Sequence, residues 1–187
     1  MSTVDWEAWW APYDEGTYRA ALAYIRRSDI VYDIGAGDLR FARRAAARAR
    51  HVYAVERNAA LLPLRLPRQP RLTVICADAL VAPVPSKVTA AVLLMRHCGH
   101  FAEYVARLRE AGCRRLITNA RWGMGVECMS LAPQPVFGAA QPGWYACRCG
   151  QVGFKPCAPE AITSELLRHD QSLENCPACQ PASPANR

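Results

Sequence analysis

Residues 29–41, DIVYDIGAGDLRF, decide the fold class of this 187-residue chain. The apolar run at residues 30–34 is typical of a buried strand, and it ends in a turn that contains Gly35 and Gly37. From residue 39 the pattern LRFARRAAARAR places alanines on one side of a helix and arginines on the other. Glycines let the backbone approach a ligand closely, and a helix N-terminus points unpaired amides at it. The sequence therefore predicts a ligand site at this turn.

Strand and helix patterns alternate over the first 131 residues. Apolar, β-rich runs stand at residues 30–34, 51–55, 72–76, 88–95 and 115–118. Helical patterns occupy residues 15–26, 39–50, a piece from residue 58, and 101–111. Because parallel strands need a long crossover connection, usually a helix, this alternation predicts an α/β fold. We expect a doubly wound, Rossmann-like, mostly parallel sheet.

Composition divides the chain into four parts. Residues 1–131 carry the α/β pattern, headed by a predicted aromatic helical cap that contains Trp6, Trp9, Trp10, Tyr13 and Tyr18. Residues 132–143 (APQPVFGAAQPG) are rich in proline and glycine, which predicts a connector. Residues 144–179 hold paired cysteines and form a predicted zinc-binding module, and residues 180–187 are expected to be a flexible tail.

The chain has a net charge of +7 at pH 7, and 51% of its residues are hydrophobic. Its longest apolar run, residues 88–95, is far below the ~20 residues needed to cross a bilayer, so we expect a cytoplasmic protein without a membrane partner. Arginine offers a fork that fits phosphate or carboxylate, so the basic excess favours a polyanionic partner. The arginines at helical spacing also fit a solvated helix face: Arg40, Arg43, Arg44, Arg48, Arg107 and Arg109.

An acid follows the glycine turn at the end of the next predicted strand, at Glu56. This separation suits two hydrogen bonds to a ribose diol, as in nucleotide-binding α/β folds. Nicotinamide or flavin dinucleotides and S-adenosylmethionine share the layout. The dinucleotide pattern G-x-G-x-x-G fits poorly, because its third glycine would fall on Arg40.

Asp33, Gly35 and Gly37 resemble motif I of the class I S-adenosylmethionine-dependent methyltransferases, and residues 29–41 are most similar to small prokaryotic lysine-methyltransferase-like proteins. Ala11-Pro12-Tyr13 ahead of a helix resembles that group as well, so the likeness covers residues 11–118. It implies that Asp33 lies near the methionine end of the cofactor, Gly35 and Gly37 line the turn, Glu56 holds the ribose hydroxyls, and Asp78 contacts the adenine amine. Asp78 also suits a helix N-cap or a turn. Leu39 stands where the family has its third glycine, so a side chain that crowds the cofactor is one expectation.

The fourth predicted strand ends in MRHCGH, residues 95–100. His97 and His100 are candidate general bases and Arg96 is a candidate contact for an acidic group of the substrate. Capping of the following helix is the alternative role for the histidines. Asn119 and Arg121, after the fifth strand, are further candidate substrate contacts, unless they belong to an ordinary polar loop. Exocyclic amines of bases or of glutamine are less expected acceptors, because the Asn or Asp, two prolines and an aromatic residue typical of those enzymes are missing here.

Cys147, Cys149, Cys176 and Cys179 form two closely spaced pairs. Four thiolates in two short turns suit a tetrahedral zinc ion, so we predict a zinc ribbon, in which Cys157 or His169 is an alternative ligand. A redox role for Cys176 and Cys179 is the rival hypothesis, but no thioredoxin-type strand-to-helix unit surrounds them.

Together these patterns predict an S-adenosylmethionine-dependent methyltransferase with a zinc ribbon, acting on a macromolecular acceptor. Protein lysine is slightly favoured by the resemblance, and RNA is next. The alternative is a non-catalytic module on a degenerate Rossmann scaffold that binds nucleic acid or protein. A nicotinamide-dependent oxidoreductase is a third hypothesis.

Overall fold

The computed structural model describes residues 11–65, 69–123 and 125–179. The chain divides into two compact units, Met1–Leu131 and Ala132–Arg187. Trp6, Trp9 and Trp10 of the expected aromatic cap, and the expected tail at residues 180–187, lie outside the described residues. In the described part of the chain, no helix has the length and apolar character that a membrane crossing requires.

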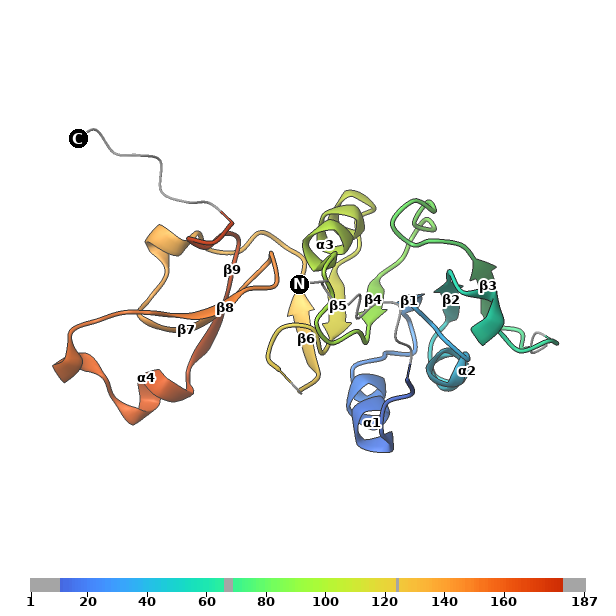
Figure 1. The fold of residues 1–187 in the computed structure, drawn as a ribbon, viewed down its shortest axis with the longest axis horizontal. Coiled ribbons are helices and arrows are strands. Elements are labelled where there is room, and N and C mark those ends of the chain that lie inside the picture. Colours follow the sequence, from blue (N-terminus) through green and yellow to red (C-terminus); the bar gives the residue numbers. More distant parts are fainter. Residues whose placement is uncertain (1–10, 66–68, 124, 180–187) are drawn as a thin grey trace, which may run out of the picture. The chain divides into compact units, whose positions relative to one another are not determined.

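A six-stranded sheet forms the centre of the first unit (Figure 1). Its strand order is β3-β2-β1-β4-β5-β6, and every neighbouring pair is parallel except β5 and β6. The strands are β1 (Ile30–Ile34), β2 (His51–Glu56), β3 (Leu72–Cys76), β4 (Ala90–Leu93), β5 (Arg115–Thr118) and β6 (Glu127–Ser130). The predicted α/β fold with a doubly wound, mostly parallel sheet is confirmed.

Helices cover both faces of this sheet. They are α1 (Glu15–Ala23), α2 (Arg40–Ala46) and α3 (Phe101–Glu110). Buried residues of α1 and α2 pack on one face against Val31, Val52 and Val92, and α3 packs on the other face against Tyr32 and Leu93. Figure 1 shows α1 and α2 on one side of the strands and α3 on the other. Alternate residues of each strand thus serve two separate cores, which explains their continuous apolar runs.

Three predicted helices are wrong in extent. The helix expected from residue 58 is a three-residue 3-10 turn, Ala59–Leu61, the helix expected at residues 15–26 ends at Ala23, and the helix expected at residues 39–50 is confined to Arg40–Ala46. The antiparallel edge strand β6 was not predicted. It pairs with β5 from Glu127 opposite Thr118 to Ser130 opposite Arg115.

The second unit contains a three-stranded sheet of order β8-β7-β9. Strand β7 (Gly143–Cys147) pairs antiparallel with β8 (Val152–Lys155) and parallel with β9 (Asp170–Leu173). Short helical pieces complete the unit: 3-10 turns at Phe137–Ala139 and Pro159–Ala161, and α4 (Ser164–Arg168). The parallel pairing places Cys147 opposite Leu173, so the chain after β9 returns to the end of β7, where the cysteines lie.

Candidate functional site

A cavity of about 440 Å³ lies at the carboxyl ends of strands β1 to β4. Its walls include residues that end or follow these strands: Gly35 after β1, Glu56 at the end of β2, Asp78 after β3, and Met95 and Arg96 after β4. The strand order reverses between β2-β1 and β4, and such switch points are where open α/β sheets bind ligands. The volume is within the range of small-molecule sites.

Asp33 is a buried acid in the wall of this cavity. Asp33 is 4% exposed, and its Oδ2 has no hydrogen-bond partner among the described residues. Burial, and then the negative charge of Glu56, raise the pKa of the Asp33 carboxyl to about 7. A buried carboxyl without a partner destabilises the fold, so the site favours a cation or a hydrogen-bond donor beside Asp33.

Glu56 organises the glycine turn. Its Oε2 accepts a hydrogen bond from the Gly37 amide and its Oε1 accepts one from the Asn58 amide, both at 2.8 Å. Each carboxylate oxygen has about two acceptor positions, so one on each oxygen remains for a ligand hydroxyl. The amides of Gly35 and Ala36 are also occupied, because both donate to the carbonyl of Val55 at 2.9 Å.

Gly35 is required where the chain passes the cavity. It has a φ of 69°, and a Cβ atom placed on it would lie 3.2 Å from Cε of Met95. A larger residue would therefore be strained in its backbone and crowded by Met95. The role of Met95 was not predicted, because the sequence gives no register between the first and fourth strands.

Leu39 does not crowd the cavity. It takes a left-handed conformation, with φ 68° and ψ 9°, and ends the turn as the N-cap of α2. Its side chain is fully buried in the core beside α1 and α2, and Leu39 is not among the cavity-lining residues. The left-handed backbone of a leucine costs about 1–2 kcal/mol, which burial of the side chain offsets.

Asp78 shapes a turn and also borders the cavity. Its Oδ1 accepts a hydrogen bond from the Leu80 amide at 2.8 Å, and its carbonyl accepts the amides of Val81 and Ala82. The residue therefore shapes the turn after β3. It also lines the cavity, half-buried, with Ala77 and Ala79 beside it.

Tyr13 joins the segment before α1 to the end of β4. Its hydroxyl accepts a hydrogen bond from the Arg96 amide at 3.0 Å, and the Arg96 guanidinium lies 4.9 Å from the centre of the Tyr13 ring. Its own amide donates to the Tyr18 hydroxyl at 3.0 Å. Nε of Arg96 is buried without a hydrogen-bond partner among the described residues. Tyr13, Tyr18 and Arg96 all line the cavity.

The other predicted acceptor-side residues are not in the cavity wall. His97 is exposed with a φ of 60°, and His100 precedes α3, where its Nδ1 lies 2.9 Å from Glu103 Oε1. Arg121 is 6% exposed and pairs with Glu127 through two contacts of 2.8 and 2.6 Å. Asn119 is 1% exposed, and both atoms of its amide lack a partner among the described residues. The roles of these four residues stay predictions.

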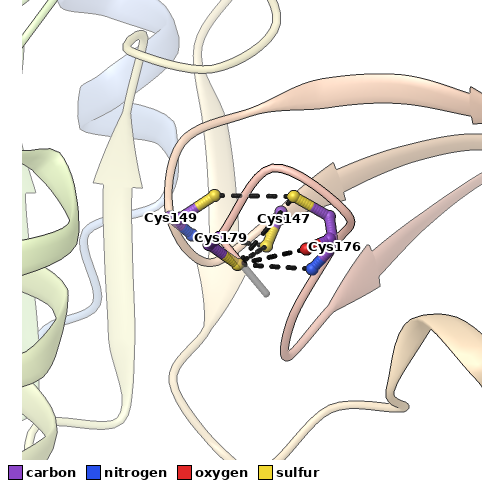
Figure 2. A group of neighbouring side chains, drawn as sticks. All are labelled: Cys147, Cys149, Cys176 and Cys179. Atoms are coloured by element: carbon purple, nitrogen blue, oxygen red, sulfur yellow. Dashed lines mark hydrogen bonds between the residues drawn. The ribbon is translucent and has the colours of Figure 1, made fainter. Parts of the chain in front are cut away.

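Four cysteines of the second unit converge on one point (Figure 2). The sulfurs of Cys147, Cys149, Cys176 and Cys179 all lie within 4.8 Å of one another. The Cys147–Cys179 and Cys149–Cys176 sulfur distances are 3.7 Å, and Cys176–Cys179 is 3.9 Å. A tetrahedral zinc ion with Zn–S bonds of ~2.3 Å requires sulfur separations of about 3.8 Å. The arrangement therefore has the dimensions of a tetrahedral metal site.

The turns around the cysteines support this geometry. The Cys149 amide donates to the Cys147 sulfur, and the Cys176 amide donates to the Cys179 sulfur. Gly150, with a φ of 99°, closes the first turn. Burial raises the pKa of the Cys147 thiol, and a positive ion beside it would favour its thiolate form. Within the described residues, the only group that could hold a metal ion consists of these four cysteines and excludes Cys157 and His169.

No protein-family model and no curated protein matches the chain. Among solved structures it is similar to the precorrin-6y C5,15-methyltransferase of Geobacter metallireducens, with a TM-score of 0.50 and 16% identity over 58% of this chain and 64% of that one. It is also similar to a precorrin 8W decarboxylase of Methanobacterium thermoautotrophicum (TM-score 0.47, 22% identity, 59% and 65% covered) and to the 23S rRNA methyltransferase ErmE (0.46, 24%, 59% and 47%). The chain spans less than two-thirds of each of these proteins. The likeness to the first supports the fold.

Proposed function

We propose that this chain is an S-adenosylmethionine-dependent methyltransferase. The observation that carries the proposal is the buried, unpartnered carboxyl oxygen of Asp33 in the wall of the cavity at the carboxyl ends of the strands. S-adenosylmethionine carries an ammonium group and a sulfonium centre, both positive. A positive group beside Asp33 would satisfy its orphaned oxygen and stabilise its ionised form.

The residues around the cavity fit the rest of this cofactor. Glu56 keeps acceptor positions for the two ribose hydroxyls, and Asp78 offers a carboxylate for the adenine amine. Gly35 keeps the floor of the turn free of side-chain atoms. When bound, the cofactor supplies an electrophilic methyl group on its sulfonium. The chain contributes mainly by orienting donor and acceptor and by excluding water.

The occupied amides of the turn argue against a dinucleotide. A pyrophosphate would need free amides at this turn, yet Gly35, Ala36 and Gly37 already donate to Val55 and Glu56. The acids Asp33 and Glu56 would also repel its negative charges. These two features favour a cationic ligand over a nicotinamide or flavin dinucleotide.

The acceptor side of the proposal rests on Arg96 and on the charge of the chain. Arg96 lines the cavity beside Tyr13, where its guanidinium can pair with an acidic group of the acceptor. We propose a macromolecular acceptor: the resemblance favours protein lysine, and the net charge of +7 suits RNA. His97 and His100 stay proposed bases, and Asn119 and Arg121 stay proposed substrate contacts. Location in the cytoplasm stays a prediction as well.

We propose zinc as the ion of the cysteine cluster. Zinc prefers four thiolates in a tetrahedron. Three of the sulfur pairs, Cys147–Cys179, Cys149–Cys176 and Cys176–Cys179, are 3.7–3.9 Å apart, in agreement with that geometry. All four positions would be filled by protein, as in structural rather than catalytic zinc sites. The ion would stabilise the second unit and leave no open position for chemistry.

Titration calorimetry on zinc-loaded protein tests the function. We expect S-adenosylmethionine and S-adenosylhomocysteine to bind, because both carry the ammonium that Asp33 would accept. 5′-Methylthioadenosine, which lacks the amino acid, should bind at least tenfold more weakly, and NAD should give no heat. Absence of heat with S-adenosylmethionine would favour the non-catalytic binding module, and binding of NAD alone would favour the oxidoreductase.

A further inference from the structure

Helix α2 and the turn after it present a row of arginines to solvent. The exposed positions between residues 43 and 50 are Arg43, Arg44, Ala47, Arg48 and Arg50. Arg71, just before β3, is also exposed and lies alongside, because its Nη1 is 3.5 Å from the carbonyl oxygen of Ala49. We call this set the arginine face: Arg40, Arg43, Arg44, Arg48, Arg50 and Arg71.

Helix stability explains only part of the arginine face. Arg43 and Arg44 lie in the last turn of α2, where a cation favours the helix dipole, but Arg40 stands at the N-terminus, where a cation opposes it. Arg40 and Arg44 are also like charges four residues apart, which destabilises a helix, and Arg48, Arg50 and Arg71 lie outside α2. The helices α1, α3 and α4 each carry both acidic and basic residues, whereas residues 39–50 contain no acid.

Most of these charges are not neutralised within the protein. Arg40 pairs with Asp38 at 2.5 Å and Arg44 pairs with Glu15 at 2.6 Å. Arg48 donates to the carbonyl oxygen of Leu22 at 2.9 Å, which fixes the guanidinium without cancelling its charge. Arg43, Arg48, Arg50 and Arg71 form no ion pair with any described residue. The face therefore keeps several positive charges for a partner.

The arginine face begins at the cavity. Arg40 lines the cavity at the N-terminus of α2, and Arg43 and Arg44 follow in the last turn of the same helix. The second unit does not share the basic character: residues 132–179 hold three basic and four acidic residues. Attraction of a polyanion would thus come from the first unit, on the side that leads to the cavity.

We propose that the arginine face binds the phosphate backbone of RNA and so leads an RNA acceptor to the cavity. Guanidinium groups match phosphate oxygens, and several arginines of one face can each bind a phosphate of the same strand. Every nucleotide of an RNA chain carries a phosphate, whereas the acids of a protein surface are irregularly placed. The choice of RNA as acceptor rests on the proposed function, while RNA docking is measured separately from it.

The test is fluorescence anisotropy of a labelled 20-nucleotide RNA of mixed sequence, titrated with the full-length, zinc-loaded protein at several salt concentrations and without cofactor. We expect Arg43→Gln/Arg48→Gln/Arg50→Gln to bind RNA at least tenfold more weakly. The slope of log affinity against log salt should fall by about 2, because each phosphate contact contributes ~0.7 for single strands. Arg43→Lys/Arg48→Lys/Arg50→Lys keeps the charges and should keep the slope.

A control variant removes the same charge elsewhere. Lys87→Gln/Arg114→Gln/Arg168→Gln neutralises three exposed basic residues outside the arginine face and should change RNA affinity less than threefold. Thermal melting of every variant shows whether it is folded. If the triple glutamine variant is not, Arg43→Gln/Arg50→Gln carries the test, because it keeps the hydrogen bond from Arg48 to the Leu22 carbonyl. An equal loss in face and control variants would overturn the proposal, because only net charge would then matter.

Three further outcomes also decide the proposal. If polyglutamate of equal charge competes as well as RNA, the partner is an acidic protein and the proposal is wrong. If a DNA strand of the same sequence binds at least tenfold better than RNA, RNA is likewise the wrong partner. S-adenosylmethionine binding without RNA binding would overturn this inference alone, whereas RNA binding without S-adenosylmethionine binding would overturn only the proposed enzyme.

Discussion

The carboxylate of Glu56 accepts a hydrogen bond from the amide of Gly37, at 2.8 Å and across 19 residues of chain. Its second oxygen holds the Asn58 amide at the same distance. One side chain at the end of β2 thus fixes the turn after β1 and the start of the next connection. The residue predicted to hold a ribose also sets the shape of the surface on which a ligand would lie.

Glu56→Gln should weaken S-adenosylmethionine binding by about 1–3 kcal/mol, since the glutamine amide nitrogen can no longer accept from a backbone amide and the charge is lost. The melting temperature should fall too, because one buried amide loses its acceptor. Calorimetry and thermal unfolding measure the two effects. Glu110→Gln, exposed at the end of α3, is the control and should change neither. Equal affinity in both variants would place the ribose elsewhere.

Binding of S-adenosylmethionine should strengthen as the pH rises from 5 to 8. The free carboxyl of Asp33 has a pKa raised to about 7 by burial and by Glu56, so below pH 7 binding must first remove its proton. The affinity should fall up to tenfold for each pH unit below 7. Calorimetry at several pH values measures this, and Asp33→Asn should give a flat profile. An equally steep profile in Asp33→Asn would assign the proton to another group.

Asp33→Asn should stabilise the ligand-free protein above pH 7. The raised pKa means that between pH ~4 and 7 the folded state binds more protons than the unfolded state, so wild-type stability falls as pH rises. A shift of ~3 pH units corresponds to about 4 kcal/mol. The melting temperature of Asp33→Asn should therefore equal that of wild type at pH 4 and exceed it at pH 8. A lower melting temperature at pH 8 would contradict an orphaned buried charge.

Cys179→Ser should release zinc and destabilise the second unit, because a structural zinc site depends on all four ligands. Metal analysis of the purified protein and its susceptibility to proteolysis after residue 131 measure both effects. Cys157→Ser and His169→Ala are matched controls, since neither residue belongs to the cluster, and they should keep one zinc per chain. Loss of zinc in Cys157→Ser would revise the ligand set.

Alanine variants are usually more stable than glycine variants in a helix, and we expect this order of stability to be reversed at Leu39. Both Leu39→Ala and Leu39→Gly lose a buried side chain, at about 2–5 kcal/mol, but only glycine relieves the left-handed backbone, by about 1 kcal/mol. We expect Leu39→Gly to be at least as stable as Leu39→Ala in chemical unfolding. At Leu22, buried within α1, Leu22→Gly should be about 1 kcal/mol less stable than Leu22→Ala. The same order at both positions would mean that Leu39 is unstrained.

Local patterns predicted the central strands well. The ranges 30–34, 72–76 and 115–118 coincide with β1, β3 and β5, because continuous apolar runs bounded by turns leave little choice in a sheet buried on both faces. The edge strand β6 escaped prediction, since Glu127–Ser130 (ECMS) is short and partly polar and forms only by pairing with β5. In the described residues 57–65, only the 3-10 turn Ala59–Leu61 forms, because Pro63 interrupts the sequence that follows it.

The candidate site was predictable where one turn contains its residues, and less so where distant segments meet. Asp33, Gly35, Glu56 and Asp78 stand beside predicted strand ends and line the cavity. The hydrogen bond from Arg96 to Tyr13 spans 83 residues, and no local pattern predicts it. Sequence spacing alone leaves several candidate ligands for the cysteine cluster. The parallel register of β7 and β9 is what brings the four cysteines together.

Leu39 shows that a left-handed turn can form without the glycine that usually occupies such a position. Its backbone keeps the angle that glycine adopts freely, because the surrounding core holds the side chain in place. Searches written as strings of required glycines will therefore overlook chains of this kind. Comparing backbone dihedral angles instead of residue types would find them.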